Sequence, residues 1–189
     1  GGTVGDFQNA MFIEAARLMK FEYPEDVLVA MVSYLPVPKS VGEMKTRPTQ
    51  HAVQELSSYG VQTNILIARS ELPLDQKRKE KLAVSCNIHP EAGIAAPDVE
   101  SIYDVPINFE KDGLSDLILK MLDIEARKKN GTLKEWGAFV EKIRSAKEEI
   151  SIAIVGKYFD TGDFILSDAY LSVIEAIKFS AAEIGVKPF

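Results

Sequence analysis

Apolar residues occur in short blocks along the first hundred positions, and the spacing within each block predicts a helix or a strand. Residues 10–20 carry apolar side chains at helical spacing, and an apolar run interrupted only by Ser33 fills residues 27–35. A short valine-rich run is typical of a strand buried on both faces, so we expect such a strand there. Residues 64–68 and 93–96 predict two more strands.

Helix signals separate these strands. Pro48 begins a pattern that runs to about Tyr59, where Gly60 predicts the stop, and residues 75–86 predict a charged helix. Strands that alternate with helices favour an α/β fold with a parallel sheet flanked by helices. In such sheets ligands bind beyond the carboxyl ends of the strands, so candidate residues are expected in the segments that follow them.

The pattern changes after residue 107. Residues 114–129 and 132–149 predict two helices, and Trp136 and Phe139 lie on one side of the second as packing anchors. The apolar residues 150–155 then predict a new strand. A last helix, capped by Ser167, is expected over residues 168–184. We therefore expect three regions, at residues 1–125, 126–149 and 150–189.

Charge and composition exclude several classes of protein. The 189 residues carry 22 basic and 28 acidic side chains, a net charge of −6, which does not favour a nucleic-acid partner. No apolar run reaches the ~18 residues of a membrane span. The single cysteine, Cys86, forms no intrachain disulfide and favours a reducing, cytoplasmic location. We expect Cys86 to be a buried apolar side chain and His51 to be solvated.

The loop from Lys45 to Gln50 is the strongest chemical signal. It places two cations, two hydroxyls and an amide at a helix N-terminus that follows a strand. That combination suits a polyphosphate, because unpaired N–H groups and cations both attract phosphate oxygens. The residues alone leave open a solvated loop with a threonine cap. Lys81 lies in a charge run typical of an exposed helix face, and Arg69 fits a ligand site or a salt bridge equally well.

Several segments together resemble one family, the CTP synthases. They are GGTVGD at 1–6, GEMKTRPTQHAVQEL at 42–56, ILIARS at 65–70, APDVESIYDVP at 96–106, ISIAIVGKY at 150–158 and DAYLSVIEAIK at 168–178. The family makes CTP from UTP with ATP and glutamine-derived ammonia. The resemblance implies the C-terminal part of a P-loop NTPase-like synthetase domain, a helical linker and the first strand and helix of a class I glutaminase domain, in the three regions given above.

The resemblance also implies ligands and partners. Magnesium serves the ATP site, GTP activates, CTP inhibits as product, and the enzymes are homotetramers, with filament formation left open. The implied UTP- and CTP-binding residues are Asp6, Gln8, Lys45, Thr46, Arg47, Pro48, Thr49, Gln50 and Lys81. The implied ATP-binding residues are Arg69, Pro97, Asp98 and Val99. No catalytic residue and no metal ligand is expected within the 189 residues.

The sequence departs from the family at three places. Phe7-Gln8 stands where Ile-Glu is usual, Arg47 replaces a lysine, and the loop between Tyr158 and Asp168 is longer. We expect the chain to be a fragment that does not turn over by itself. Two alternatives remain at this point: a non-catalytic nucleotide-binding or assembly module of the same fold, or an α/β domain for another anionic metabolite.

Overall fold

The structure is a computed structural model that describes residues 2–126, 132–157 and 167–188. The chain divides into two compact units, residues 1–127 and 128–189, and each is described by itself. The longer loop expected between Tyr158 and Asp168 falls largely outside the described residues, as does the end of the helix expected over 114–129.

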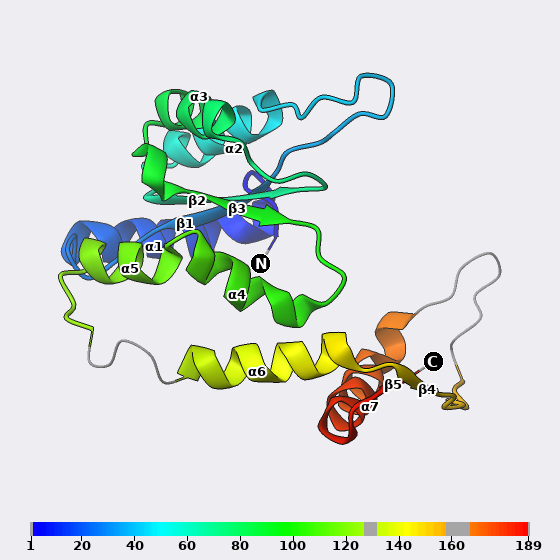
Figure 1. Ribbon diagram of the computed structural model, residues 1–189. Coiled ribbons are helices and arrows are strands. Elements are labelled where there is room, and N and C mark those ends of the chain that lie inside the picture. The colour runs from blue at the N-terminus through cyan, green and yellow to red at the C-terminus, as the bar shows by residue number, and fades with distance from the viewer. Residues whose placement is uncertain (1, 127–131, 158–166, 189) are drawn as a thin grey trace. The chain divides into compact units, whose positions relative to one another are not determined.

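The first unit is an α/β sandwich around a three-stranded parallel sheet in the order β1-β2-β3 (Figure 1). Its elements are α1 (Ala10–Glu22), β1 (Ala30–Tyr34), α2 (Arg47–Ser58), β2 (Ile65–Ser70), α3 (Gln76–Cys86), β3 (Gly93–Pro97), α4 (Val105–Lys111) and α5 (Leu114–Met121). Helices α2 and α3 cover one face of the sheet, and α1, α4 and α5 lie on the other. The predicted parallel sheet flanked by helices is confirmed.

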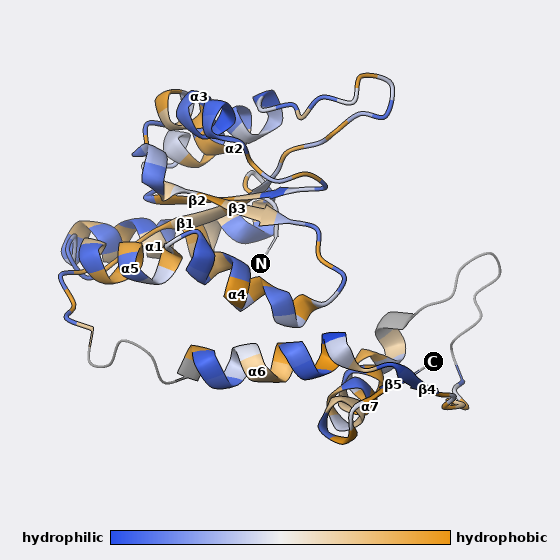
Figure 2. Ribbon diagram, viewed as in Figure 1, coloured by the Kyte–Doolittle hydropathy of each residue, from blue (hydrophilic) through white to orange (hydrophobic). Residues whose placement is uncertain are grey.

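The core of this unit lies between the sheet and the pair α2 and α3. Leu35, Leu66 and Leu82 are fully excluded from solvent, and Val53 of α2 packs in the same cluster. Figure 2 shows the matching pattern, with apolar strands and with polar residues prominent on α3. Burying side chains of this size contributes about 1.5–3 kcal/mol each, so this layer holds the two helices on the sheet.

Strand β1 is not buried on both faces, which corrects the sequence prediction. Met31 and Leu35 are buried, whereas 62% of Val32 and 49% of Tyr34 are exposed. Successive side chains of a strand point to opposite faces, so one face of β1 is covered and the other is open. The physical reason is that β1 is an edge strand of the described sheet, and the helices on the second face leave Val32 and Tyr34 uncovered.

The helices after β3 also differ from the prediction. The structure contains α4, which the sequence analysis missed although Pro106 stands in its first turn, a position that suits proline. Gly113, with φ of +78°, separates α4 from α5 in a left-handed conformation that favours glycine. Helix α5 ends at Met121 rather than near residue 129.

The second unit contains α6 (Thr132–Ser145), β4 (Glu148–Ile150), a 3-10 turn (Ser167–Tyr170), α7 (Leu171–Ile184) and β5 (Val186–Pro188). Strands β4 and β5 pair in parallel over three residues each. The ring of Phe139 lies 5.7 Å from that of Trp136 and 4.3 Å from that of Phe179 on α7, which confirms the predicted packing anchors.

The strand expected over residues 150–155 is wrong in position. The strand covers Glu148–Ile150, which pairs with Val186–Pro188, and residues 151–156 have no regular structure. The helix expected to start after Ser167 begins at Leu171, preceded by the 3-10 turn. In the described ranges, no helix combines the length and the apolar character that crossing a membrane requires.

Candidate functional site

The carboxyl ends of the three parallel strands are tied together by hydrogen bonds. The Leu35 N–H donates to the Arg69 carbonyl (2.7 Å), and the buried Ser70 hydroxyl donates to the Leu35 carbonyl (3.0 Å). On the other side, the Asp98 N–H donates to the Ser70 carbonyl (2.9 Å). The segments that follow β1, β2 and β3 are therefore held next to one another, at the edge where the sequence places the candidate residues.

Two of the predicted ATP-binding residues meet at this edge. Arg69 Nη2 lies 2.9 Å from Asp98 Oδ1, so the salt bridge that the sequence left open for Arg69 is present. Both side chains are about half exposed, and an ion pair of that kind contributes about 0–1 kcal/mol. Pro97 and Val99 are partly buried on either side of Asp98. The pair orients the segment after β3 more than it stabilises the fold.

The predicted phosphate loop contains an inner group of buried residues. Thr46, Thr49 and Gln50 are all at least nine-tenths buried. The Thr49 hydroxyl donates to the Tyr34 carbonyl (3.2 Å) and accepts from the Ser33 hydroxyl (3.0 Å), and Gln50 Nε2 donates to Thr46 Oγ1 (3.2 Å). These bonds fix the start of α2 against β1.

The outer group of the loop comprises Lys45, Arg47 and Pro48. Lys45 is partly exposed, and Arg47 and Pro48 are exposed at the first turn of α2. Thr46 stands at the N-cap position, but its side chain makes no capping hydrogen bond to a helix N–H, so the threonine cap that the sequence left open is absent. The first turn of α2 therefore has N–H groups that no side-chain cap occupies, beside two cations.

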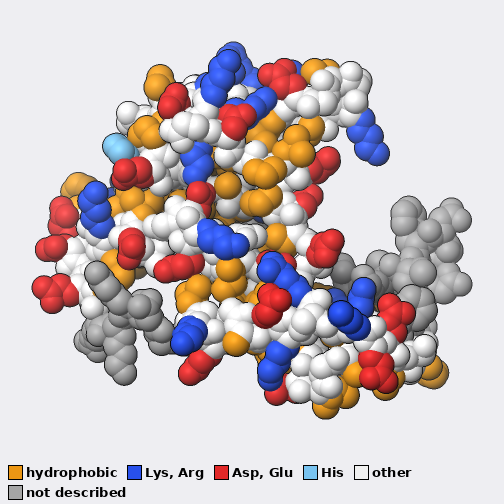
Figure 3. Space-filling model, viewed as in Figure 1, with side chains coloured by type: hydrophobic (Ala, Val, Ile, Leu, Met, Phe, Trp, Pro, Cys, Tyr) orange, Lys and Arg blue, Asp and Glu red, His pale blue; other side chains and the backbone are white. Residues whose placement is uncertain are grey.

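Helix α3 brings further cations to the loop, where they surround Glu43. Lys45 Nζ lies 2.9 Å from Glu43 Oε2, and Arg78 Nη2 lies 3.8 Å from Glu43 Oε1. The hydrogen bond from Lys45, with the charges of Lys45, Arg78 and Lys81, lowers the pKa of Glu43 below its ordinary value. Figure 3 shows Lys and Arg side chains over α3, with acidic side chains beside them. Lys81, which the sequence alone assigned to a solvated face, thus belongs to the surroundings of the loop.

Sequence reasoning missed Arg78. The available signal was its spacing, because Arg78 precedes Lys81 by three residues and so shares a helix face with it. Arg78 is held in place by Asp75, the N-cap of α3, whose carboxylate accepts from the Arg78 N–H (2.8 Å) and pairs with the guanidinium. The backbone hydrogen bond, followed by the side-chain one, lowers the pKa of Asp75.

A second anchor fixes the other side of α3. Lys79 Nζ lies 2.7 Å from Asp112 Oδ1, and Asp112 Oδ2 accepts from the Ala95 N–H at 2.6 Å. Asp112 stands at the corner between α4 and α5, so one carboxylate joins α3, β3 and that corner. It thereby helps to hold both the helix that carries Lys81 and the strand that leads to Pro97.

The remaining candidate residues interact less with the other parts of the site. Asp6 Oδ2 accepts from the Thr3 N–H (3.1 Å), and Gln8 is exposed in the 3-10 turn Phe7–Asn9. In the described part of the chain, neither side chain forms a hydrogen bond or ion pair with the loop. His51 is exposed and Cys86 is buried, as predicted, and burial raises the pKa of the Cys86 thiol.

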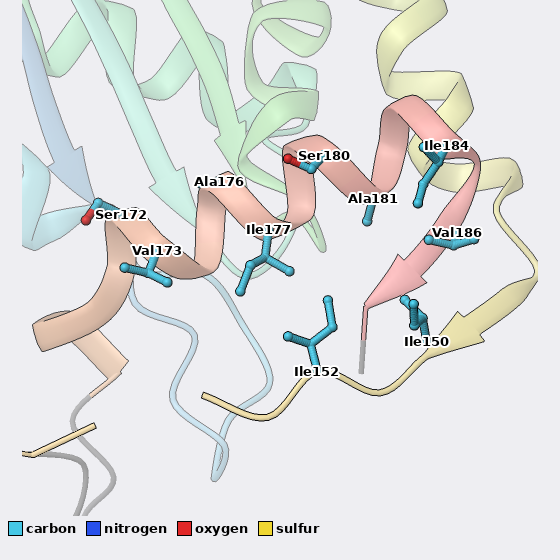
Figure 4. A pocket seen from close by; sticks show the side chains of 10 residues that line it. All are labelled: Ile150, Ile152, Ser172, Val173, Ala176, Ile177, Ser180, Ala181, Ile184 and Val186. Carbon is cyan, nitrogen blue, oxygen red and sulfur yellow. The ribbon is translucent and has the colours of Figure 1, made fainter. Parts of the chain in front are cut away.

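The second unit has an apolar pocket of about 450 Å³ beside α7 (Figure 4). Ile150, Ile152 and Val186 line one side, and Val173, Ala176, Ile177, Ala181 and Ile184 line the other, with Ser172 and Ser180. It holds no ionisable side chain, so it does not offer the chemistry that a phosphate ligand needs.

The family described as CTP synthase N-terminus matches residues 1–124 of the chain. The chain is 43% identical to a CTP synthase of Methanococcus aeolicus and 45% identical to one of Methanocaldococcus jannaschii, each over 99% of this chain and 34% of the relative. A CTP synthase of Bacillus licheniformis is 38% identical over 99% of this chain and 35% of its own length. The chain thus spans about a third of the length of these curated relatives. With a match that extends over the whole sheet and its helices, the chain belongs to the CTP synthase family.

Proposed function

We propose that this chain supplies the pyrimidine-nucleotide triphosphate site and part of the ATP adenine pocket of a CTP synthase, a ligase that aminates UTP to CTP with ATP and glutamine-derived ammonia. One observation carries the proposal: Lys45 from the loop and Arg78 from α3 both pair with the Glu43 carboxylate, and Lys81 is close enough to help lower its pKa. Two separate elements thus bring positive charge to one place beyond the carboxyl end of β1.

The site is required to hold the nucleotide in position. Amination through a phosphorylated pyrimidine depends on holding the nucleotide in place, as phosphoryl transfer does in general. Lys45, Arg47 and Lys81 would neutralise the triphosphate, and the N–H groups at the start of α2 would bind its oxygens. The buried Thr49 and Gln50 would contribute indirectly, by fixing where α2 begins.

The proposed adenine segment is Pro97–Val99. The Asp98 N–H already donates to Ser70, so the Val99 N–H is the remaining backbone donor of this segment, and the neighbouring Asp98 carbonyl is an acceptor for which the described part of the chain shows no partner. One acceptor and one donor on neighbouring residues match the edge of an adenine. Arg69, paired with Asp98, would lie close to the phosphates of the same ligand.

We propose several further properties on the basis of the family resemblance and not of the geometry of this site. These are activation by GTP, inhibition by CTP, homotetramer formation, and a glutaminase domain that begins within residues 150–189 after a linker over 126–149. Among the described residues, no group of three or more His, Cys, Asp or Glu side chains could hold a metal ion. The Mg²⁺ of the ATP site is thus also proposed from the family, and the described residues supply no cluster of this kind for it.

Calorimetric titration with UTP tests the proposal. The parent chain is expected to bind UTP, and the double variant Lys45→Ala, Arg47→Ala to bind at least tenfold more weakly, because two cations are lost. The matched control is Lys111→Ala, Lys120→Ala, which removes two exposed cations from α4 and α5 and should leave binding unchanged. Equal UTP affinity in parent and double variant would overturn the proposal.

A further inference from the structure

The carboxylate of Glu43 lies among cations that the proposed ligand would need. Its two oxygens face different partners, Oε2 towards Lys45 at 2.9 Å and Oε1 towards Arg78 at 3.8 Å. One cation comes from the loop and the other from α3, so Glu43 bridges the two elements. Among the described residues, it is the only side chain that forms ion pairs with a cation of the loop and a cation of α3.

An exposed carboxylate in this position resembles a phosphate group in its charge and its oxygen atoms. Glu43 is more than half exposed, so the side chain has room to move away without disturbing the core. Arg78 is the more constrained partner, since Asp75 also binds its guanidinium. Removal of Glu43 would therefore free Lys45 while leaving Arg78 oriented by Asp75.

We propose that Glu43 acts as an internal stand-in for a ligand phosphate, which an incoming nucleotide triphosphate displaces, and that Arg78 is a further cation of the same site. This inference rests on the proposed function and adds to it a competing group and a contact residue. In the nucleotide-free chain, Glu43 limits repulsion between Lys45, Arg78 and Lys81. When a triphosphate binds, its oxygens replace the carboxylate and Glu43 turns outward, because two anions cannot share these cations.

The two parts of the proposal predict opposite effects. Glu43→Gln keeps the shape of the side chain but removes its charge, so UTP and inorganic tripolyphosphate should each bind about threefold more tightly, the scale of one exposed ion pair. Arg78→Gln should weaken both ligands by about the same factor or more. Uridine carries no phosphate, so its affinity should be the same in parent and variants.

Two matched controls separate a local effect from a change in net charge. Glu25→Gln removes an exposed carboxylate before β1, at the opposite end of the strand from the loop. Lys77→Gln removes an exposed cation from α3, next to Arg78. Both controls should bind UTP with an affinity within a factor of about 1.5 of the parent, the size expected of an exposed, screened charge that does not contact the ligand.

The measurement is calorimetric titration of the 189-residue chain and each variant at low and at physiological salt. Tighter binding by Glu43→Gln and weaker binding by Arg78→Gln, with unchanged controls, is the expected result. If the parent binds UTP but Glu43→Gln binds it equally or more weakly, the stand-in role is overturned while the proposed function stands. If Arg78→Gln matches Lys77→Gln, Arg78 is not part of the site. A parent that does not bind UTP would remove the proposed function, and this inference with it.

Discussion

Replacement of Asp112 should cost more stability than any other single surface change in the first unit, because one carboxylate joins three elements. Asp112→Ala removes the acceptor of the Ala95 N–H at 2.6 Å and the partner of Lys79 at 2.7 Å. A hydrogen bond to a charged group is worth about 1.5–3 kcal/mol. The side chains of Lys79 and Asp112 are 17% and 25% exposed, so the ion pair is only partly screened and is counted at about 1 kcal/mol, the upper end of the range for surface pairs.

The free energy of unfolding is therefore expected to fall by about 2.5–4 kcal/mol in Asp112→Ala. Asp112→Asn retains an oxygen for the Ala95 N–H but loses the charge, and should cost only about 1 kcal/mol. Lys79→Gln provides the other corner of a double-mutant cycle with Asp112→Asn, and a coupling of at least ~0.5 kcal/mol is expected for residues in contact.

Urea unfolding followed by circular dichroism gives these free energies, and hydrogen exchange of the Ala95 amide reports the local effect. Asp112→Ala should speed exchange at Ala95 far more than Asp112→Asn does, since only the alanine variant leaves that N–H without its acceptor. A cost below ~0.5 kcal/mol for Asp112→Ala, the range of ordinary surface changes, would refute the reasoning.

Three further outcomes are expected. Leu82→Ala, at a fully buried position, should lower the free energy of unfolding by about 2–5 kcal/mol, whereas Val84→Ala, 86% exposed on the same helix, should change it by less than ~0.5 kcal/mol in urea unfolding. The lowered pKa of Asp75 means that the folded state binds fewer protons, so its contribution to stability is present above the ordinary carboxyl pKa and is lost as the pH falls through about 4 and below. When unfolding curves are measured over a series of pH values, the free energy of unfolding should fall less at low pH in Asp75→Asn than in the parent. The same fall in both proteins would contradict this expectation. A chimera in which this chain replaces the matching segment of the Methanocaldococcus jannaschii relative should form CTP from UTP, ATP and ammonia. The same chimera with Lys45→Ala, Arg47→Ala should lose this activity.

The sequence predicted the alternation of helices and strands because each strand is a short apolar run between helix signals. It did not predict the exposed face of β1, since an apolar run does not say which neighbours a strand will have; Val32 and Tyr34 look the same in sequence whether covered or open. It missed α4 because seven residues hold too few apolar positions for a periodic signal, although Pro106 marked the first turn.

The candidate site was predicted in its composition but not in its arrangement. Lys45 to Gln50 appeared as one cationic loop, whereas the structure divides it into a buried group packed against β1 and a more exposed group. The approach of Arg78 and Lys81 to Glu43 depends on how α3 lies on the sheet. That placement is set by Leu82 and by Asp112, which no local pattern near the loop reveals.

The buried half of the loop gives a last prediction, because it separates placement of α2 from contact with a ligand. The Thr49 side chain is fully buried and its hydroxyl is already paired with Ser33 and Tyr34, so a nucleotide could reach Thr49 only through its backbone N–H. Thr49→Val keeps the shape but leaves the Tyr34 carbonyl without that donor, at about 1–3 kcal/mol of unfolding free energy. Well below its melting temperature, this variant should still bind UTP within about threefold of the parent, while Lys45→Ala, Arg47→Ala keeps the stability and loses the affinity. Ser33→Ala is the matched control, since it removes the other partner of the same hydroxyl and should also reduce stability more than binding. If Thr49→Val lost UTP binding as fully as the double variant at unchanged stability, the hydroxyl would have to contact the ligand directly, and the loop would have to open before the nucleotide could enter.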